Sequence, residues 1–296
     1  MVIFNVLYSQ PTDQRLALSS LPPELLVNVL AFLDDGDSVT SLRSCSLVSH
    51  AWTYISQALL FQSVTLRTPT EVTAFMFLLN DSPHISPLVR SLSAEPRGLH
   101  YTSTMAHHTK LHEAIILRIA FRLPNLKHLH LSPLAFFKLS IGTRDIFARR
   151  FRKLQSLKFT HPTFNPIGGQ YRAFLECCLR KPCLKSFEVE LDQYAIDSGD
   201  HESSAMVYET PPKFLRSLST LEVKLEELIL QSVSQQFWLD FESLCVATRM
   251  RATRVKLLVR APDLRNAMNC LSVLANSVEK LEFAVALMRE PHLEGS

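Results

Sequence analysis

The sequence predicts an α/β protein, with a small N-terminal three-helix domain followed by an irregular solenoid of strand–helix repeats. Three observations carry this prediction. A compact apolar block runs from Leu21 to about Leu66, segments of the form L-x-x-L-x-L recur after it, and helix-like apolar stretches separate those segments. The chain also holds 48 leucines but only seven glycines in 296 residues, a composition that favours packed repeats.

Composition excludes several other classes. No glycines form G-x-G-x-x-G, and none begins G-x-x-x-x-G-K-[ST], so the plainest phosphate-binding loops are missing. The net charge of +3 does not by itself indicate nucleic-acid binding. We expect no secretory signal and no membrane span, since the first ten residues carry no basic residue and no apolar run approaches 18 residues. Six sparse cysteines then indicate reduced thiols in the cytoplasm and/or nucleus.

The apolar block has the pattern of three short helices and a strand. Ser20 precedes two prolines as an N-cap would, and Asp37 is placed to cap the second helix. An alternating run, Phe61–Leu66, predicts a strand after the third helix. The apolar positions of the helices are Leu25, Leu26, Val29, Leu30 and Leu33, then Val39, Leu42 and Cys45, and finally Val48, Trp52, Ile55 and Leu59.

This block resembles the F-box. The resemblance rests on Leu21-Pro22-Pro23-Glu24-Leu25, then Val29-Leu30 and Leu33, then Leu47-Val48 and Trp52, with Asp37 and Leu42 standing for the second helix. The continuation from Leu59 to Leu66 resembles the segment directly after the F-box in many fungal members. Ser49 stands where the family often has cysteine, and the turn at 34–37 is polar where proline is common. The alternative is a three-helix bundle that simply caps the rest of the chain.

The remainder of the chain has an internal period. The segments begin 28, 30, 41, 27 and 26 residues apart, near the 20–29 residues of leucine-rich repeats. Their positions are Leu126, Leu129 and Leu131; Leu154, Leu157 and Phe159; Leu184, Phe187 and Val189; Leu225, Leu228 and Leu230; Ala252, Val255 and Leu257; and Val278, Leu281 and Phe283. Val89, Leu92 and Ala94 are a poorer, earlier copy. Helical faces are expected between them over 111–123, 171–179, 237–246 and 264–274.

One part of the leucine-rich-repeat signature is missing. The position that usually holds Asn or Cys is occupied by Leu134, Pro162, Asp192, Val233, Arg260 and Ala286. No asparagine ladder can therefore form, and we expect a degenerate solenoid. An ordinary mixed α/β domain with coincidental leucine spacing is the alternative.

These patterns predict an organisation of three parts. Residues 1–19 form an N-terminal arm, residues 20–66 the F-box-like helical domain, and residues 67–296 the repeat domain. A polar stretch at 197–212 indicates a loop inserted into the longest repeat.

The histidines, cysteines and basic clusters of the sequence do not match the spacing of a known metal or catalytic motif. His107, His108 and His112, with His100 nearby, lack the H-E-x-x-H pattern, and a solvated helix start explains them. Cys177, Cys178 and Cys183 lack paired C-x₂-C spacing, so buried thiols are the simpler interpretation. His128 and His130 flank Leu129 on an expected strand and point away from its leucine face. Basic residues cluster at Arg144, Arg149, Arg150, Arg152 and Lys153, and at Arg249, Arg251, Arg254 and Lys256, where solvated loop edges or acidic partners explain them.

The resemblance implies an adaptor and not an enzyme, with no catalytic, metal or cofactor site. The F-box would bind the adaptor subunit of an SCF-type ubiquitin ligase, and through it the cullin, while the repeats bind a protein substrate, with no nucleic acid and no membrane. The residues expected to bind the ligase adaptor are Leu21, Pro22, Leu25, Leu30 and Trp52. The alternative is a non-ligase repeat scaffold, in which Leu21, Leu25 and Trp52 face inward. An enzyme would need a pocket of perturbed titratable groups.

Overall fold

The computed structural model describes residues 23–31, 38–47, 50–94, 113, 116–118, 121–132, 136, 139–160, 162, 170–191 and 222–286. The chain divides into two compact units, Met1–Gln62 and Ser63–Ser296. The predicted N-terminal arm, the polar turn at 34–37, the inserted loop at 197–212 and His100, His107, His108 and His112 lie outside the described residues.

The first unit contains the three helices that the apolar spacing predicts. They are α1 (Pro23–Ala31), α2 (Ser38–Cys45) and α3 (His50–Gln62). The strand expected from Phe61 begins later, because Phe61 and Gln62 are the last residues of α3 and β1 spans Ser63–Leu66. Ala58, Leu59 and Leu60 carry the helix forward since alanine and leucine are strong helix formers, whereas Val64 and Thr65 are β-branched and favour a strand.

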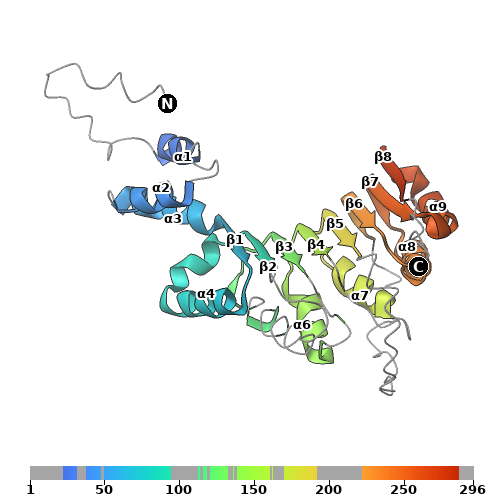
Figure 1. Cartoon of the computed structure of the whole chain (residues 1–296), viewed down its shortest axis with the longest axis horizontal. Helices are drawn as coiled ribbons and strands as arrows, with labels where there is room; N and C mark the ends of the chain where they lie inside the picture. The colour runs from blue at the N-terminus through green and yellow to red at the C-terminus, as the bar shows by residue number, and fades with distance from the viewer. Residues whose placement is uncertain are drawn as a thin grey trace, which may run out of the picture. The chain divides into compact units, whose positions relative to one another are not determined.

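The second unit is built on one eight-stranded sheet. All strands are parallel and follow one another in chain order, from β1 to β8 (Figure 1). After β1 come β2 (Ser91–Ala94), β3 (His128–Leu131), β4 (Ser156–Thr160), β5 (Ser186–Glu190), β6 (Lys224–Gln231), β7 (Arg251–Arg260) and β8 (Lys280–Ala286). The six expected repeat strands and the poorer copy at Val89–Ala94 are all present, each as one strand of this sheet. The leucine-rich-repeat assignment itself stays a prediction.

Helices connect the strands and lie along one face of the sheet (Figure 1). They are α4 (Pro69–Asp81), α6 (Ile141–Arg150), α7 (Gln170–Leu179), α8 (Gln235–Thr248) and α9 (Leu264–Leu274), with short 3-10 turns η3 (Pro83–Leu88), η6 (Ala261–Asp263) and η7 (Ala275–Ser277). The stretches expected at 171–179, 237–246 and 264–274 are therefore helical, as predicted. In the stretch expected at 111–123, only part of the chain is described.

The strands place their apolar residues in continuous rows. Leu129 pairs with Leu157, which pairs with Phe187, and the residues two positions further along each strand form a second row. These side chains are buried on the face that the helices cover. Between Leu129 and Leu131, and between Leu157 and Phe159, the two-residue period of a strand puts the intervening polar residue on the opposite face.

An aromatic layer fills the space between helix and sheet near the middle of the sheet. The ring of Phe174 on α7 lies 4.8 Å from Phe159 and 5.1 Å from Phe136, both in edge-to-face geometry. Phe147 on α6 lies 6.4 Å from Phe159 and extends the layer towards α6. Aromatic pairs of this kind add about 0.5–1.5 kcal/mol beyond the area they bury.

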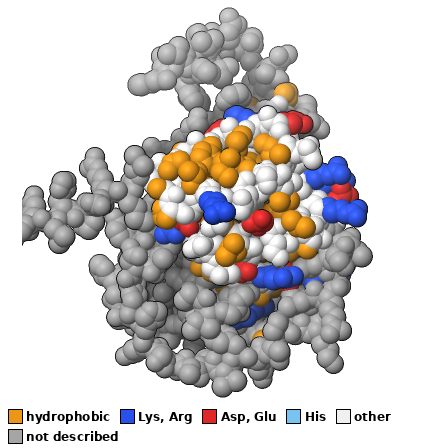
Figure 2. Space-filling model, turned by 90° about the vertical axis from the view of Figure 1, so that its right-hand side faces the viewer, with side chains coloured by type: hydrophobic (Ala, Val, Ile, Leu, Met, Phe, Trp, Pro, Cys, Tyr) orange, Lys and Arg blue, Asp and Glu red, His pale blue; other side chains and the backbone are white. Residues whose placement is uncertain are grey.

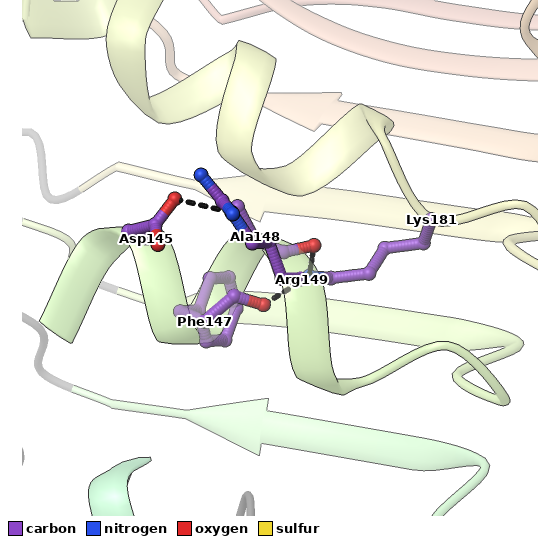
Figure 3. Close-up of polar contacts among 5 residues, drawn as sticks. All are labelled: Asp145, Phe147, Ala148, Arg149 and Lys181. Atoms are coloured by element: carbon purple, nitrogen blue, oxygen red, sulfur yellow. Dashed lines mark hydrogen bonds and ion pairs between the residues drawn. The ribbon is translucent and has the colours of Figure 1, made fainter. Parts of the chain in front are cut away.

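The sequence lacks the asparagines that bond backbone groups in regular leucine-rich repeats. Near the middle of the sheet, a buried lysine forms hydrogen bonds to backbone carbonyl groups. Lys181, in the turn after α7, donates hydrogen bonds from Nζ to the carbonyl oxygens of Phe147 and Ala148, at 3.0 Å for Ala148 (Figure 3). Those carbonyls belong to the last turn of α6, which has no intrahelical donors for them. The ammonium group also lies 4.6 Å from the centre of the Phe147 ring. Burial lowers the pKa of Lys181 from 10.5 to about 8.

The final strand has no described helix over its apolar face. Leu281, Phe283 and Val285 continue the buried rows of β7, yet all three are exposed. Figure 2 views this end of the molecule and shows hydrophobic side chains gathered on its surface. The buried rows therefore end in an open apolar face at β8.

Candidate functional site

The first unit has a small apolar core that holds its helices together. Leu30 on α1, Leu42 on α2 and Trp52 on α3 are buried against one another. Cys45, Ile55, Leu59 and Leu60 pack around them. One residue from each helix therefore meets at the centre, as the apolar spacing of the sequence requires.

The five residues expected to bind a ligase adaptor separate into different environments. Leu30 and Trp52 are buried, with 0% and 8% of their surface exposed, so the structure brings these two together as core residues. Leu25 is 50% exposed on α1 and is available to a partner. Leu21 and Pro22 lie outside the described residues.

Four further apolar side chains are exposed on this unit and are not among the expected binding residues, and one of them is Val27 on α1, which is 41% exposed. Val29 is 49% exposed and lies four residues after Leu25, so the two share one face of α1. Leu47 follows α2 and is 87% exposed, and Tyr54 on α3 is also exposed. The helical spacing of Leu25 and Val29 is a signal in the sequence that points to this face. We call Leu25, Val29 and Leu47 the apolar anchors.

Such anchors are suited to binding another protein by burial. Covering an exposed side chain of this size contributes about 1.5–3 kcal/mol. Two or three of them therefore supply the centre of an interface, provided that polar contacts surround them.

The polar face of the sheet carries hydroxyl groups and histidines in its first half. His130 lies between two hydroxyls, with Nδ1 3.1 Å from Ser93 Oγ on β2 and Nε2 3.0 Å from Thr160 Oγ1 on β4. His128, two residues earlier, keeps an exposed surface, and its pKa is lowered by partial desolvation of the ring and by the charge of Lys127. Both histidines lie on the face away from the leucines, as the alternation predicts.

The second half of the same face carries paired charges. Lys158 lies 3.0 Å from Glu188, and Lys280 lies 2.8 Å from Glu282. Arg254 and Lys256 lie farther, at 3.8 Å and 3.6 Å, from Glu227 and Glu282 respectively. A shallow pocket over β6–β8 is lined by several of these side chains together with Ile229 and Val255. It offers polar contacts of both signs to a binding partner.

Most cysteines of the described chain are buried as free thiols. Cys177, Cys178, Cys245 and Cys270 are buried, which fits the interpretation of Cys178 as a packed thiol, whereas Cys183 is exposed. Burial raises the pKa of Cys177 to about 11 and that of Cys270 to about 12, so both remain protonated near neutral pH.

Two kinds of feature are absent from the described residues. Among them, no group of three or more His, Cys, Asp and Glu side chains is arranged to hold a metal ion. No helix within the described ranges is long and apolar enough to span a membrane.

Comparison with known families identifies the first unit. A family model described as F-box-like matches residues 18–67, which include α1, α2, α3 and β1. No curated protein matches the chain with significance. The matched segment begins just before the Leu-Pro-Pro-Glu-Leu sequence and ends just after Leu66. The chain therefore carries an F-box-like domain at residues 18–67.

Proposed function

We propose that the chain is the substrate-recognition subunit of an SCF-type cullin ubiquitin ligase. The F-box-like domain supports membership of this functional class. The proposal assigns binding of the ligase adaptor to the first unit and binding of a protein substrate to the sheet unit. The chemistry of ubiquitin transfer then belongs to the other subunits, and this chain acts by holding its partner near them.

The observation that carries the proposal is the exposure of the apolar anchors within the F-box-like domain. Leu25 and Val29 are half-exposed although Leu30, the residue directly after Val29, is completely buried. A helix bundle that only capped the sheet would leave its apolar residues facing inward, since contact of an apolar side chain with water is unfavourable. The exposed face of α1 therefore favours the adaptor role over the alternative of a non-ligase scaffold.

The adaptor-binding surface is tested by removing two anchors. Leu25→Ser combined with Val29→Ser is expected to weaken binding to the purified adaptor subunit at least about tenfold, because each lost side chain removes roughly 1–2 kcal/mol of apolar burial. Isothermal titration calorimetry measures the affinity. A second variant, Leu21→Ala with Pro22→Ala, probes the start of the F-box-like sequence in the same assay.

A matched control comes from the sheet unit. Leu239 and Val246 are exposed apolar residues on α8, so Leu239→Ser with Val246→Ser changes the same kind of surface elsewhere. This control is expected to bind the adaptor as the parent does. The proposal fails if the parent chain forms no complex with the adaptor subunit. It also fails if the Leu25→Ser/Val29→Ser variant binds the adaptor as tightly as the Leu239→Ser/Val246→Ser control.

A further inference from the structure

Charge is distributed very unevenly along this chain. Its net charge is only +3, yet residues 82–160 contain thirteen lysines and arginines against three acidic residues, Glu95, Glu113 and Asp145. The rest of the chain is therefore acidic overall. Of these three carboxylates, two lie among the described residues, and both are already engaged. Asp145 lies 2.7 Å from Arg149, and Glu113 accepts hydrogen bonds from Ser140 N and Thr143 Oγ1 (Figure 3 for Asp145).

The fold gathers many of these cations at one edge of the sheet. They lie at or beside the turns that lead into β2, β3 and β4, where the parallel strands begin. All are exposed except Lys127, which is partly buried. We call them the basic ridge, which consists of Arg90, Arg122, Lys127, Arg150, Arg152 and Lys153.

Hydrogen bonds fix the successive turns of the ridge side by side. The backbone N–H of Lys127 donates to the carbonyl of Arg90 at 2.7 Å, and the N–H of Gln155 donates to the carbonyl of Lys127 at 2.7 Å. Lys153 Nζ donates to Asn125 Oδ1 at 2.9 Å, which ties the third turn to the second. The backbone of these turns is therefore held in register from one strand to the next.

The ridge differs from the second basic cluster of the chain in its acidic neighbours. No described carboxylate lies within ion-pair distance of Arg90, Arg122 or Arg152. In the second cluster, Arg251 lies 3.7 Å from Glu222, and Arg254 and Lys256 face Glu227 and Glu282. Since like charges repel, a row of cations without such partners costs free energy that an anionic partner would recover.

We propose that the basic ridge binds a short acidic segment of a partner protein, through carboxylate or phosphate groups. Three neighbouring strands are about 10 Å across, which an extended chain spans with three or four residues. Arginine guanidinium groups bind carboxylate and phosphate oxygens in pairs, so both kinds of anion fit the same ridge. The assignment of this segment to the ligase substrate rests on the proposed function, whereas the binding itself does not.

The surroundings of the ridge favour a short segment over a nucleic acid. Beyond β4 the edge becomes mixed in charge, since Lys185 is paired with Glu226 at 2.6 Å. A long polyanion would meet the acidic side chains there. Phe121 is 60% exposed beside the ridge, and the Arg150 guanidinium lies 5.0 Å from the centre of its ring, so a base that stacked on this face of the ring would have to displace Arg150.

The test measures binding of labelled peptides to the full chain by fluorescence anisotropy, with no ligase adaptor present. The probes are a peptide with four consecutive glutamates, the same peptide with phosphoserines in place of two of them, and a version with four glutamines. A single-stranded dT12 oligonucleotide is the competing class. We expect either or both anionic peptides to bind at least tenfold more tightly than the glutamine peptide, with affinity that falls as salt rises.

Two triple variants with the same change in net charge locate the site. Arg90→Gln, Arg122→Gln and Arg152→Gln are expected to weaken binding of the anionic peptide at least tenfold. Arg251→Gln, Arg254→Gln and Lys256→Gln are expected to change it less than twofold. The emission of buried Trp238 and the thermal midpoint verify that both proteins are folded.

Three outcomes would overturn the proposal. The anionic peptides bind no more tightly than the glutamine peptide, the two triple variants weaken binding equally, or dT12 binds more tightly than either anionic peptide. Because no adaptor is present, a failure here leaves the calorimetric test of adaptor binding untouched.

Discussion

Replacing Trp52 by alanine is expected to unfold the F-box-like domain and abolish adaptor binding while the sheet unit remains folded. Trp52 is buried with Leu30 and Leu42 in a core that has one such residue from each helix. Removing a buried tryptophan side chain costs about 3–5 kcal/mol. A helical unit of this size has about the same total stability, so the loss leaves no margin.

Hydrogen exchange with mass spectrometry locates the expected damage. Amides of α1 to α3 should lose protection, whereas those of β3 to β5 should keep it, since the two units are separate compact bodies. The chain holds two tryptophans, so in this variant Trp238 alone reports on the sheet unit. Tyr54→Ala, at an exposed position of the same helix, should leave exchange unchanged. Undiminished adaptor binding by Trp52→Ala would contradict the assignment of Trp52 to the core.

The second large effect concerns Lys181 and should appear as a dependence on pH. Lys181 binds the terminal carbonyls of α6, and burial lowers its pKa from 10.5 to about 8. Between these two values the unfolded chain keeps a proton that the folded chain has released. The contribution of Lys181 to the free energy of unfolding therefore rises with pH, from about 8 to about 10.5, by roughly 3 kcal/mol in total.

Nearby thiols have the opposite effect, so Lys181 must be isolated by difference. Burial raises the pKa of Cys177 to about 11 and also raises the pKa of Cys178 well above its usual value, which makes stability fall as the unfolded thiols ionise. Urea unfolding of the parent and of Lys181→Met, measured at pH 7.5 and pH 10.5, removes by difference the part of this contribution that comes from burial of the thiols, and leaves the interaction between the thiols and the charge of Lys181. We expect the stability deficit of the variant to grow by about 3 kcal/mol between the two pH values.

At pH 7.5 the free energy of unfolding of Lys181→Met should be only slightly lower than that of the parent. Methionine leaves two buried carbonyls without a donor, which costs about 1–3 kcal/mol each, but it also removes a charge whose burial is unfavourable by a similar amount. Lys181→Arg, which keeps a charge at all these pH values, should show no such growth with pH. A deficit that is independent of pH in Lys181→Met would show that Lys181 titrates normally.

The strands are the most predictable part of this fold. Leu129, Leu157 and Leu228 are recognisable by spacing because a buried strand needs apolar residues at every second position, whatever its neighbours are. Even the weak segment at Ala252–Leu257 forms β7, since its small Ala252 is buried in the same row as Leu225. The end of the first helical block is less predictable. Phe61 alternates with its neighbours as a strand residue would, but the helix preceding it decides its conformation.

The candidate site is predictable only in part. The spacing identifies Leu30 and Trp52 as important, but the periodic apolar pattern does not distinguish a core position from an exposed one when a helix is short. Lys181 gives no signal, because its partners are backbone carbonyls 33 and 34 residues away. Two residues among those described, Ser232 and Arg249, have a left-handed backbone conformation. The sequence does not predict this conformation, because glycine is the residue that usually indicates it.

The sequential order of the sheet has a consequence for how the chain folds. The most distant paired residues in neighbouring strands, Ser186 and Glu227, are 41 positions apart, and Arg254 and Lys280 are only 26 apart. Within the described sheet, each strand pairs only with strands that are its neighbours in the sequence. The entropic cost of closing the loop between paired strands is therefore modest. Such local pairing favours rapid folding and allows the sheet to grow strand by strand from the ribosome, with each new strand adding to an edge already formed.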